Sequence, residues 1–209
     1  MRKTCAVLCS CLLLGLAAPL AAADAVKLPA PRKSGGPDVL AAIETRASGS
    51  SFSGAVSDEE LATVLWAATG RNRDGGGWTI PMAMGKPPYC DIYVAGKNSA
   101  HLYDRENHAL IPAASGDLRS KIAKQDIAKN AYYSLVVVMD GAAAKAIRKD
   151  TWEQIAGFAV GAATQNIYLA CEALGLKTRF IISVNPDVAR KELALHDGDV
   201  VACIMALGK

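Results

Sequence analysis

The sequence contains few of the groups that most often perform catalysis or bind metals. It has only three histidines, His101, His108 and His196, and none lies at ligand spacing from a second histidine or a carboxylate. It also lacks the Gly-x-Ser-x-Gly turn of serine hydrolases, the P-loop and the Gly-x-Gly-x-x-Gly dinucleotide fingerprint. We therefore predict no metal site, and we expect the three histidines to be surface or hairpin residues.

The sequence also has no Cys-x-x-Cys motif and only a small net charge. Three of the six cysteines lie before residue 12, and the others, Cys90, Cys171 and Cys203, form no Cys-x-x-Cys pair. Cys171 and Cys203 lie in apolar stretches and are predicted to be core thiols, although a disulfide between two of the three stays open. The formal net charge is only +3, and no basic stripe with interleaved aromatic residues occurs. The charge distribution therefore gives no argument for nucleic-acid binding.

The first 23 residues are typical of a secretory signal peptide. Arg2 and Lys3 precede an apolar stretch at residues 6–20, and three alanines at positions 21–23 fit a cleavage site. We expect cleavage near Ala23–Asp24 and export to the periplasm or the exterior. The alternative is an uncleaved membrane anchor, although the apolar stretch is short for a span.

The predicted helix Thr151–Gly175 has no charged residue between Ile155 and Cys171. Apolar residues occupy nearly all of its faces, so this helix should lie inside a core or inside a membrane. The amides of Gln165 and Asn166 argue against hydrocarbon, and we predict a buried central helix with no membrane span in the mature chain. Gly157 and Gly161 would let another backbone approach this helix closely.

The remaining pattern alternates helices with buried strands. A capping box at Ser57–Glu60 opens a helix that ends at Gly70. Other helices are predicted at residues 37–46, 117–127 and 187–193. Strands are predicted at residues 89–95, 100–103, 108–112, 135–139, 178–184 and 200–206. We predict a flexible tether at residues 24–36 and a single α+β domain at residues 37–209, with a sheet sandwiched by helices.

One short stretch carries the groups that bind a phosphate monoester. Arg46, Ser48 and Ser50 place one guanidinium and two hydroxyls within five residues. A helix C-terminal arginine followed by a serine-rich loop would explain the same pattern without any ligand.

Four stretches together resemble the nitroreductase family of FMN-dependent oxidoreductases, and its SagB-type dehydrogenase branch in particular. They read IETRASGSSF, SDEELATVLWAATGRNR, TIPMAMGKPPYCDIYVA and GAATQNIYLACEALGL, and the last is the most specific match. The similarity runs from about Val39 to Lys209. It implies a nitroreductase-like sandwich with a central, mostly antiparallel sheet and a long buried helix at a homodimer interface.

The resemblance also implies a cofactor, a reaction and a set of contacts. Family members bind FMN between two subunits and pass hydride from NAD(P)H or another donor to a small acceptor such as a nitro compound or a quinone. The flavin performs this chemistry, so no catalytic side chain is expected. By position, Arg46 and Ser48 would hold the phosphate and ribityl chain, Pro81 would lie beside the ring, and Ile182 and Ser183 would place backbone near flavin N5. The full set of cofactor contacts implied in this way is Arg46, Ser48, Ser50, Pro81, Met82, Gly85, Ile182 and Ser183.

Several positions depart from the family pattern. Ser50 replaces a second basic residue, Ala47 replaces an arginine, Met82 replaces a serine, and Gly85 replaces an asparagine that contacts the ring. Each lost charge-assisted hydrogen bond costs about 1.5–3 kcal/mol. The alternative prediction is therefore a non-catalytic relative, a binding or interaction protein on the same scaffold that has lost tight FMN binding.

Overall fold

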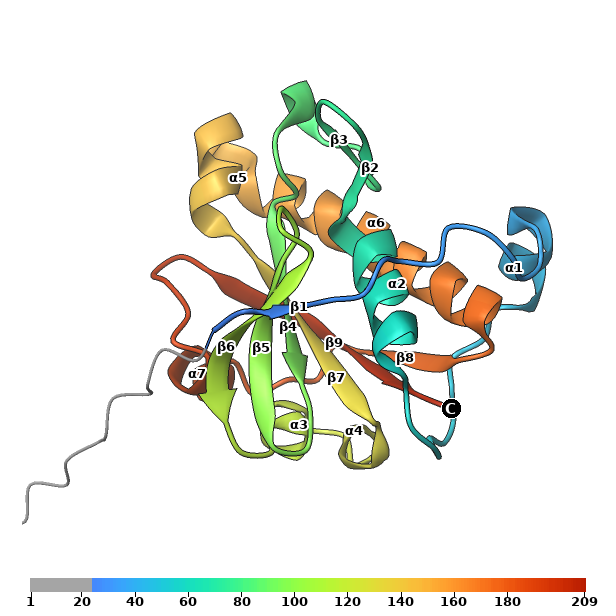
Figure 1. Ribbon diagram of the computed structural model, residues 1–209. Helices are drawn as coiled ribbons and strands as arrows, with labels where there is room; N and C mark the ends of the chain where they lie inside the picture. The colour runs from blue at the N-terminus through green and yellow to red at the C-terminus, as the bar shows by residue number, and fades with distance from the viewer. Residues whose placement is uncertain (1–23) are drawn as a thin grey trace, which may run out of the picture.

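A computed structural model describes residues 24–209, and the predicted signal peptide lies outside the described residues. A seven-stranded sheet with the order β1-β6-β5-β4-β7-β9-β8 forms its centre, and all neighbouring strands are antiparallel (Figure 1). Its strands are β1 (Val26–Lys27), β4 (Cys90–Ala95), β5 (Ser99–Asp104), β6 (Ala109–Ser115), β7 (Tyr133–Met139), β8 (Lys177–Ile181) and β9 (Val200–Gly208). A separate hairpin pairs β2 (Arg71–Arg73) with β3 (Gly77–Trp78).

Helices cover both faces of the sheet. The helices are α1 (Val39–Thr45), α2 (Asp58–Thr69), α3 (Arg119–Ile122), α4 (Ile127–Asn130), α5 (Gly141–Ile147), α6 (Trp152–Leu174) and α7 (Pro186–Glu192). Two 3-10 turns, η1 (Ala83–Gly85) and η2 (Lys149–Thr151), accompany them. One core lies between the sheet and helices α2 and α6, and the other lies between the sheet and helices α3, α4 and α7. The predicted α+β sandwich is confirmed.

The central strand β7 shows why the sheet is buried on both sides. Leu135 and Val137 belong to the α2–α6 core, whereas Val136 and Val138 belong to the opposite core. All four side chains are at most 1% exposed. Because side chains alternate across a strand, a continuous apolar run can fill both cores at once.

The long predicted helix is present as α6 and ends at Gly175, whose φ of 67° gives the left-handed cap. The expectation of burial on all faces is wrong for the single chain. One stripe, Gln154, Phe158, Gly161 and Gln165, is exposed, and Phe158 is 67% exposed. The steps of four, three and four residues place this stripe on a single face of the helix. None of the described helices is long and apolar enough to cross a membrane.

Two local predictions need correction. The predicted tether instead lies along the domain and passes α2 on its way to α1, because Leu28 is buried and β1 pairs with β6 (Figure 1). The predicted helix at residues 117–127 is divided into α3 and α4, because Ala123 is extended and bridges Val184. The capping box is confirmed, with Ser57 and Glu60 exchanging both hydrogen bonds.

Cys90, Cys171 and Cys203 are buried and unpaired, which confirms core thiols at the last two. Burial raises the pKa of Cys90 and of Cys203 to about 12, and it also raises the pKa of Cys171. All three are therefore protonated at neutral pH, and none is an activated nucleophile.

Candidate functional site

The loop Arg46–Ser50, the Arg46 loop below, follows the last turn of α1 and lies along the edge strand β8. Asp38 caps α1 by accepting hydrogen bonds from two backbone amides, and Arg46 closes its last turn. Ser48 forms a parallel bridge with Thr178, and the Gly49 amide donates to the Thr178 carbonyl at 2.8 Å. The loop therefore uses the outer edge of the sheet as its support.

Tyr168 of α6 contacts two of the predicted site residues. The Arg46 guanidinium lies 4.9 Å from the centre of the Tyr168 ring. The Ser48 hydroxyl lies 2.7 Å from the Tyr168 hydroxyl, which also accepts a hydrogen bond from the Phe180 amide at 3.0 Å. Tyr168 itself is 8% exposed. A buried ring thus fixes the position of a cation and of a hydroxyl that remain accessible.

A second guanidinium lies beside the same loop. Arg179 of β8 donates from Nη1 to the Gly49 carbonyl at 3.1 Å. Lys209 also lies close, since its carbonyl accepts from the Ser53 amide, but its ammonium pairs with Glu60 at 3.2 Å. In residues 24–209 no carboxylate forms an ion pair with Arg46 or Arg179. Two guanidinium groups without acidic partners therefore flank Ser48.

Ile182 and Ser183 continue the chain directly after β8. Ile182 is 69% exposed. The Ser183 carbonyl accepts from the Lys124 amide at 2.9 Å, and its hydroxyl accepts from the Gln125 side chain at 3.0 Å. The structure thus places these two predicted site residues directly after the strand that supports the Arg46 loop. Ser50 is exposed on the loop itself.

The segment Pro81–Gly85, the Pro81 loop below, has a different construction. Pro81, Met84 and Gly85 are exposed, whereas Met82 packs partly against the core. Met84 and Gly85 have φ angles of 54° and 66°, in the left-handed region that glycine adopts most readily. The Gly85 carbonyl accepts from the Trp78 indole at 3.3 Å. What this loop presents to solvent is main chain and methionine rather than charge.

The two loops lie on different sides of α6 in one chain. The Asn166 amide donates to the carbonyls of Ala67 and Thr79, which secures the segment that leads into the Pro81 loop. Tyr168 instead faces the Arg46 loop. Two residues along a helix differ in direction by about 200°. Figure 1 accordingly shows the β2–β3 hairpin and α1 at different ends of the molecule, with α6 running between them. The structure therefore does not bring Pro81, Met82 and Gly85 together with the other predicted site residues.

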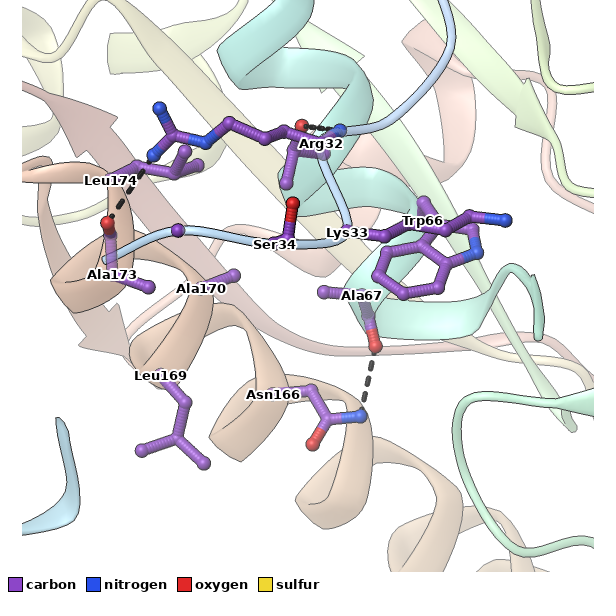
Figure 2. Close-up of a pocket in the computed structure, with 12 residues that line it drawn as sticks. Arg32, Lys33, Ser34, Trp66, Ala67, Asn166, Leu169, Ala170, Ala173 and Leu174 are labelled. Atoms are coloured by element: carbon purple, nitrogen blue, oxygen red, sulfur yellow. Dashed lines mark hydrogen bonds between the residues drawn. The ribbon is translucent and has the colours of Figure 1, made fainter. Parts of the chain in front are cut away.

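A cavity of about 250 Å³ lies between the segment Arg32–Gly35, α2 and the C-terminal half of α6 (Figure 2). Its walls are mainly apolar. At one end the Arg32 amide donates to Thr63 at 2.9 Å and the Arg32 guanidinium donates to the Ala173 carbonyl at 3.4 Å. None of the predicted site residues lines this cavity.

Sequence reasoning missed Tyr168 and Arg179. Both reach the Arg46 loop from more than 100 residues along the chain. Tyr168 belongs to a helix in which nearly every residue is apolar, so no pattern distinguished its hydroxyl. The only available signal for Arg179 was its basic side chain in a strand otherwise predicted to be buried.

Comparison with known proteins gives consistent matches. The model of the nitroreductase family matches residues 44–209. A solved structure described as a nitroreductase from Ralstonia eutropha has 27% sequence identity and a TM-score of 0.82 over 90% of each chain. A structure described as a nitroreductase from Anabaena variabilis has 16% identity and a TM-score of 0.75, covering 96% of this chain and 45% of that one. A chain of a microcin synthetase complex from Escherichia coli has 16% identity and a TM-score of 0.70, covering 78% and 68%. The curated proteins contain no match.

Proposed function

The chain belongs to the nitroreductase family of oxidoreductases, and from this premise we propose that it is an exported FMN-dependent enzyme acting as a homodimer. It would transfer hydride from NAD(P)H or another donor to a small organic acceptor such as a nitro compound or a quinone. The proposal includes a periplasmic or secreted location, for which the first 23 residues are the support. It also keeps the kinship with SagB-type dehydrogenases, for which the support is the sequence of α6.

The Arg46 loop fits the phosphate end of FMN. A phosphate monoester is bound best by guanidinium groups and by hydroxyl or amide donors. Arg46, Arg179 and the Ser48 hydroxyl supply these groups without a competing carboxylate in an ion pair. Arg179 would supply the second basic group, which the family pattern has at the position of Ser50.

A second copy of the chain would complete the site. The Pro81 loop and the Arg46 loop lie on different sides of α6, so one flavin cannot be expected to touch both within a single chain. Six of the exposed large apolar side chains lie on α1, on α6, on β8 and directly after β8, namely Val39, Leu40, Ile43, Phe158, Phe180 and Ile182. A Cβ built on Gly157 or Gly161 would meet no atom within 4 Å. These open glycines suit close contact with a partner helix, as in a two-fold dimer.

Within that dimer the protein positions groups rather than supplying a reactive one. FMN, when bound, supplies the hydride-accepting ring. The Arg46 loop would hold its phosphate, and the exposed main chain of the partner's Pro81 loop would cover the ring. Ile182 and Ser183 would contribute backbone near the reactive face. The raised thiol pKa values of Cys90 and Cys203, about 12 for each, agree with a site that does not use cysteine.

The second candidate function is a non-catalytic binding protein. One observation favours it: the Pro81 loop exposes Met84 and Gly85 and offers no charged side chain between residues 81 and 85. Without the flavin, the same dimeric scaffold would act only as a binding or interaction protein.

The absorption spectrum of the purified protein separates the two functions. The proposed enzyme shows flavin bands as isolated, or retains them through desalting after FMN is added, and oxidises NAD(P)H with a nitroaromatic or quinone acceptor. A protein that stays colourless after FMN addition would contradict the proposal and favour the non-catalytic alternative.

A further inference from the structure

We propose that Tyr168 is a positioning residue that preassembles the phosphate-binding groups of the Arg46 loop, so that it controls selection of FMN over riboflavin. The inference rests on the proposed function, because it assigns a role within the same flavin site. It concerns a residue that the sequence pattern did not single out.

The Tyr168 hydroxyl lies in a short chain of hydrogen bonds. That oxygen accepts from the Phe180 amide at 3.0 Å and lies 2.7 Å from the Ser48 hydroxyl. A phenol has a single proton to donate. With the Phe180 bond in place, Tyr168 can donate this proton to Ser48, which leaves the Ser48 proton free to point outward. An anion beside Ser48 favours this arrangement, because all three dipoles then point toward the negative charge.

Arg46 lies against the ring of the same tyrosine. Its guanidinium lies 4.9 Å from the centre of the Tyr168 ring, within the range of a cation–π contact. Such a contact holds the side chain without neutralising its charge, whereas an ion pair would compete with phosphate. The ring of Tyr168 therefore orients the cation, and its hydroxyl orients the hydrogen-bond donor.

These contacts lie at the edge of the sheet. β8 is an edge strand, so the outward amides of its residues need partners from outside the sheet. The Tyr168 hydroxyl accepts from one of these amides, and the Gly49 amide donates to the Thr178 carbonyl on the same strand. The Arg46 loop, α6 and the sheet edge are thus joined at Tyr168, which is buried.

A purely structural role for Tyr168 predicts a different outcome from a positioning role. If Tyr168 only caps the Phe180 amide, its loss would weaken the binding of both flavins equally. If it orients Ser48 toward phosphate, its loss would weaken the binding of FMN alone, because riboflavin has the same ring and ribityl chain but no phosphate.

The test measures the dissociation constants of FMN and riboflavin by fluorescence titration for the wild type, Tyr168→Phe, Ser48→Ala and the double variant. Tyr168→Phe keeps the ring under Arg46 and removes only the hydroxyl. We expect FMN affinity to fall by about threefold to tenfold, the scale of one weakened hydrogen bond to a charged group, with riboflavin affinity unchanged. In the Ser48→Ala background the same change should have no further effect on FMN. Ser51→Ala, which changes an exposed serine directly after the loop, is the control and should leave both constants unchanged.

Three results have distinct meanings. Equal losses for both flavins, or no change for FMN in Tyr168→Phe, would overturn the positioning role while leaving FMN binding intact. Additive losses in the double variant would show that Tyr168 does not act through Ser48 and would also overturn it. A wild-type protein that binds neither flavin would instead contradict the proposed function itself.

Discussion

The Arg46 loop and the Pro81 loop were both assigned to one cofactor by sequence resemblance, yet they are built in different ways. The Arg46 loop is tied to α6 and β8 by side-chain contacts from Tyr168 and Arg179. The Pro81 loop is exposed, with positive φ angles at Met84 and Gly85 and support from the Trp78 indole. In the proposed dimer, one chain alone would organise the phosphate end of the site. The ring end would depend on exposed backbone that the second subunit meets.

The largest expected effect comes from separating the two loops by breaking the dimer. Gly161→Leu places a bulky side chain on the exposed face of α6, where a Cβ meets no atom of the same chain. Folding should be preserved, but overpacking costs about 1–3 kcal/mol at each of two symmetric positions, so dimer affinity should fall about 100-fold or more. Sedimentation and flavin content provide the measurement.

Gly161→Ala is the matched control for that change. It adds one methyl group to the same exposed position and should weaken the dimer much less. A Gly161→Leu variant that remains dimeric would show that this face of α6 is not the interface.

The next effect tests the phosphate end alone. Arg46→Ala should weaken FMN binding by about tenfold or more, the scale of one lost charge-assisted hydrogen bond, and should leave riboflavin binding unchanged. Arg73→Ala, which removes an exposed arginine from β2, serves as the control. Equal FMN affinity in wild type and Arg46→Ala would show that Arg46 is misassigned.

A smaller effect is expected at the ring end. Gly85 has a φ of 66° and open space around its missing Cβ, and asparagine tolerates this conformation better than most residues. Gly85→Asn should therefore fold normally and place an amide where the family pattern has one. We expect the affinities of FMN and riboflavin to change together, by a few-fold, because both share the ring. A change confined to FMN would contradict the division of labour between the loops.

The smallest effect concerns the N-terminal segment rather than the flavin. His108 contacts the Tyr103 hydroxyl and the Pro29 carbonyl. Burial lowers the pKa of His108, although the hydrogen bond to Pro29 acts to raise it. Burial also lowers the pKa of His101. In the folded chain these two histidines therefore become protonated only at a lower pH than in the unfolded chain, where their pKa is about 6.5. The free energy of unfolding should fall as the pH drops from about 7 through that value toward the lowered folded pKa values.

Melting temperatures at pH 7.5 and 5.5 measure this dependence. His108→Asn should reduce the difference between the two, because it removes one of the two rings whose pKa is lowered. Asparagine tolerates the φ of 50° at this position. An unchanged difference would exclude His108 as a contributor.

The sequence predicted the fold best where a pattern has only one physical solution. The run Leu135–Val138 requires cover on both faces, and the helix that became α6 has no charge over most of its length. Prediction was poorer where tertiary contacts decide. Residues 24–36 look like a linker in isolation, but Leu28 is buried and β1 gains a partner in β6. Helix α5 was missed because its alanine-rich sequence has little amphipathic pattern.

The candidate site follows the same rule. Residue types and the family resemblance both pointed to Arg46 and Ser48, because their motif is local. It could not reveal that Tyr168 and Arg179 support them, since those contacts depend on how α6 and β8 pack. Nor could it show that the Pro81 loop faces a different side of α6, because the direction of a loop relative to a helix is set by the fold. The burial of α6 was overestimated for a related reason: apolar composition does not tell whether the covering surface comes from the same chain.

Native mass spectrometry of the purified protein mixed with FMN tests the central claim most directly, since it reports subunit number and bound flavin in one spectrum. The account predicts a dimer carrying two FMN molecules. A flavin-free monomer, or a dimer that carries no FMN under conditions that preserve non-covalent complexes, would contradict it.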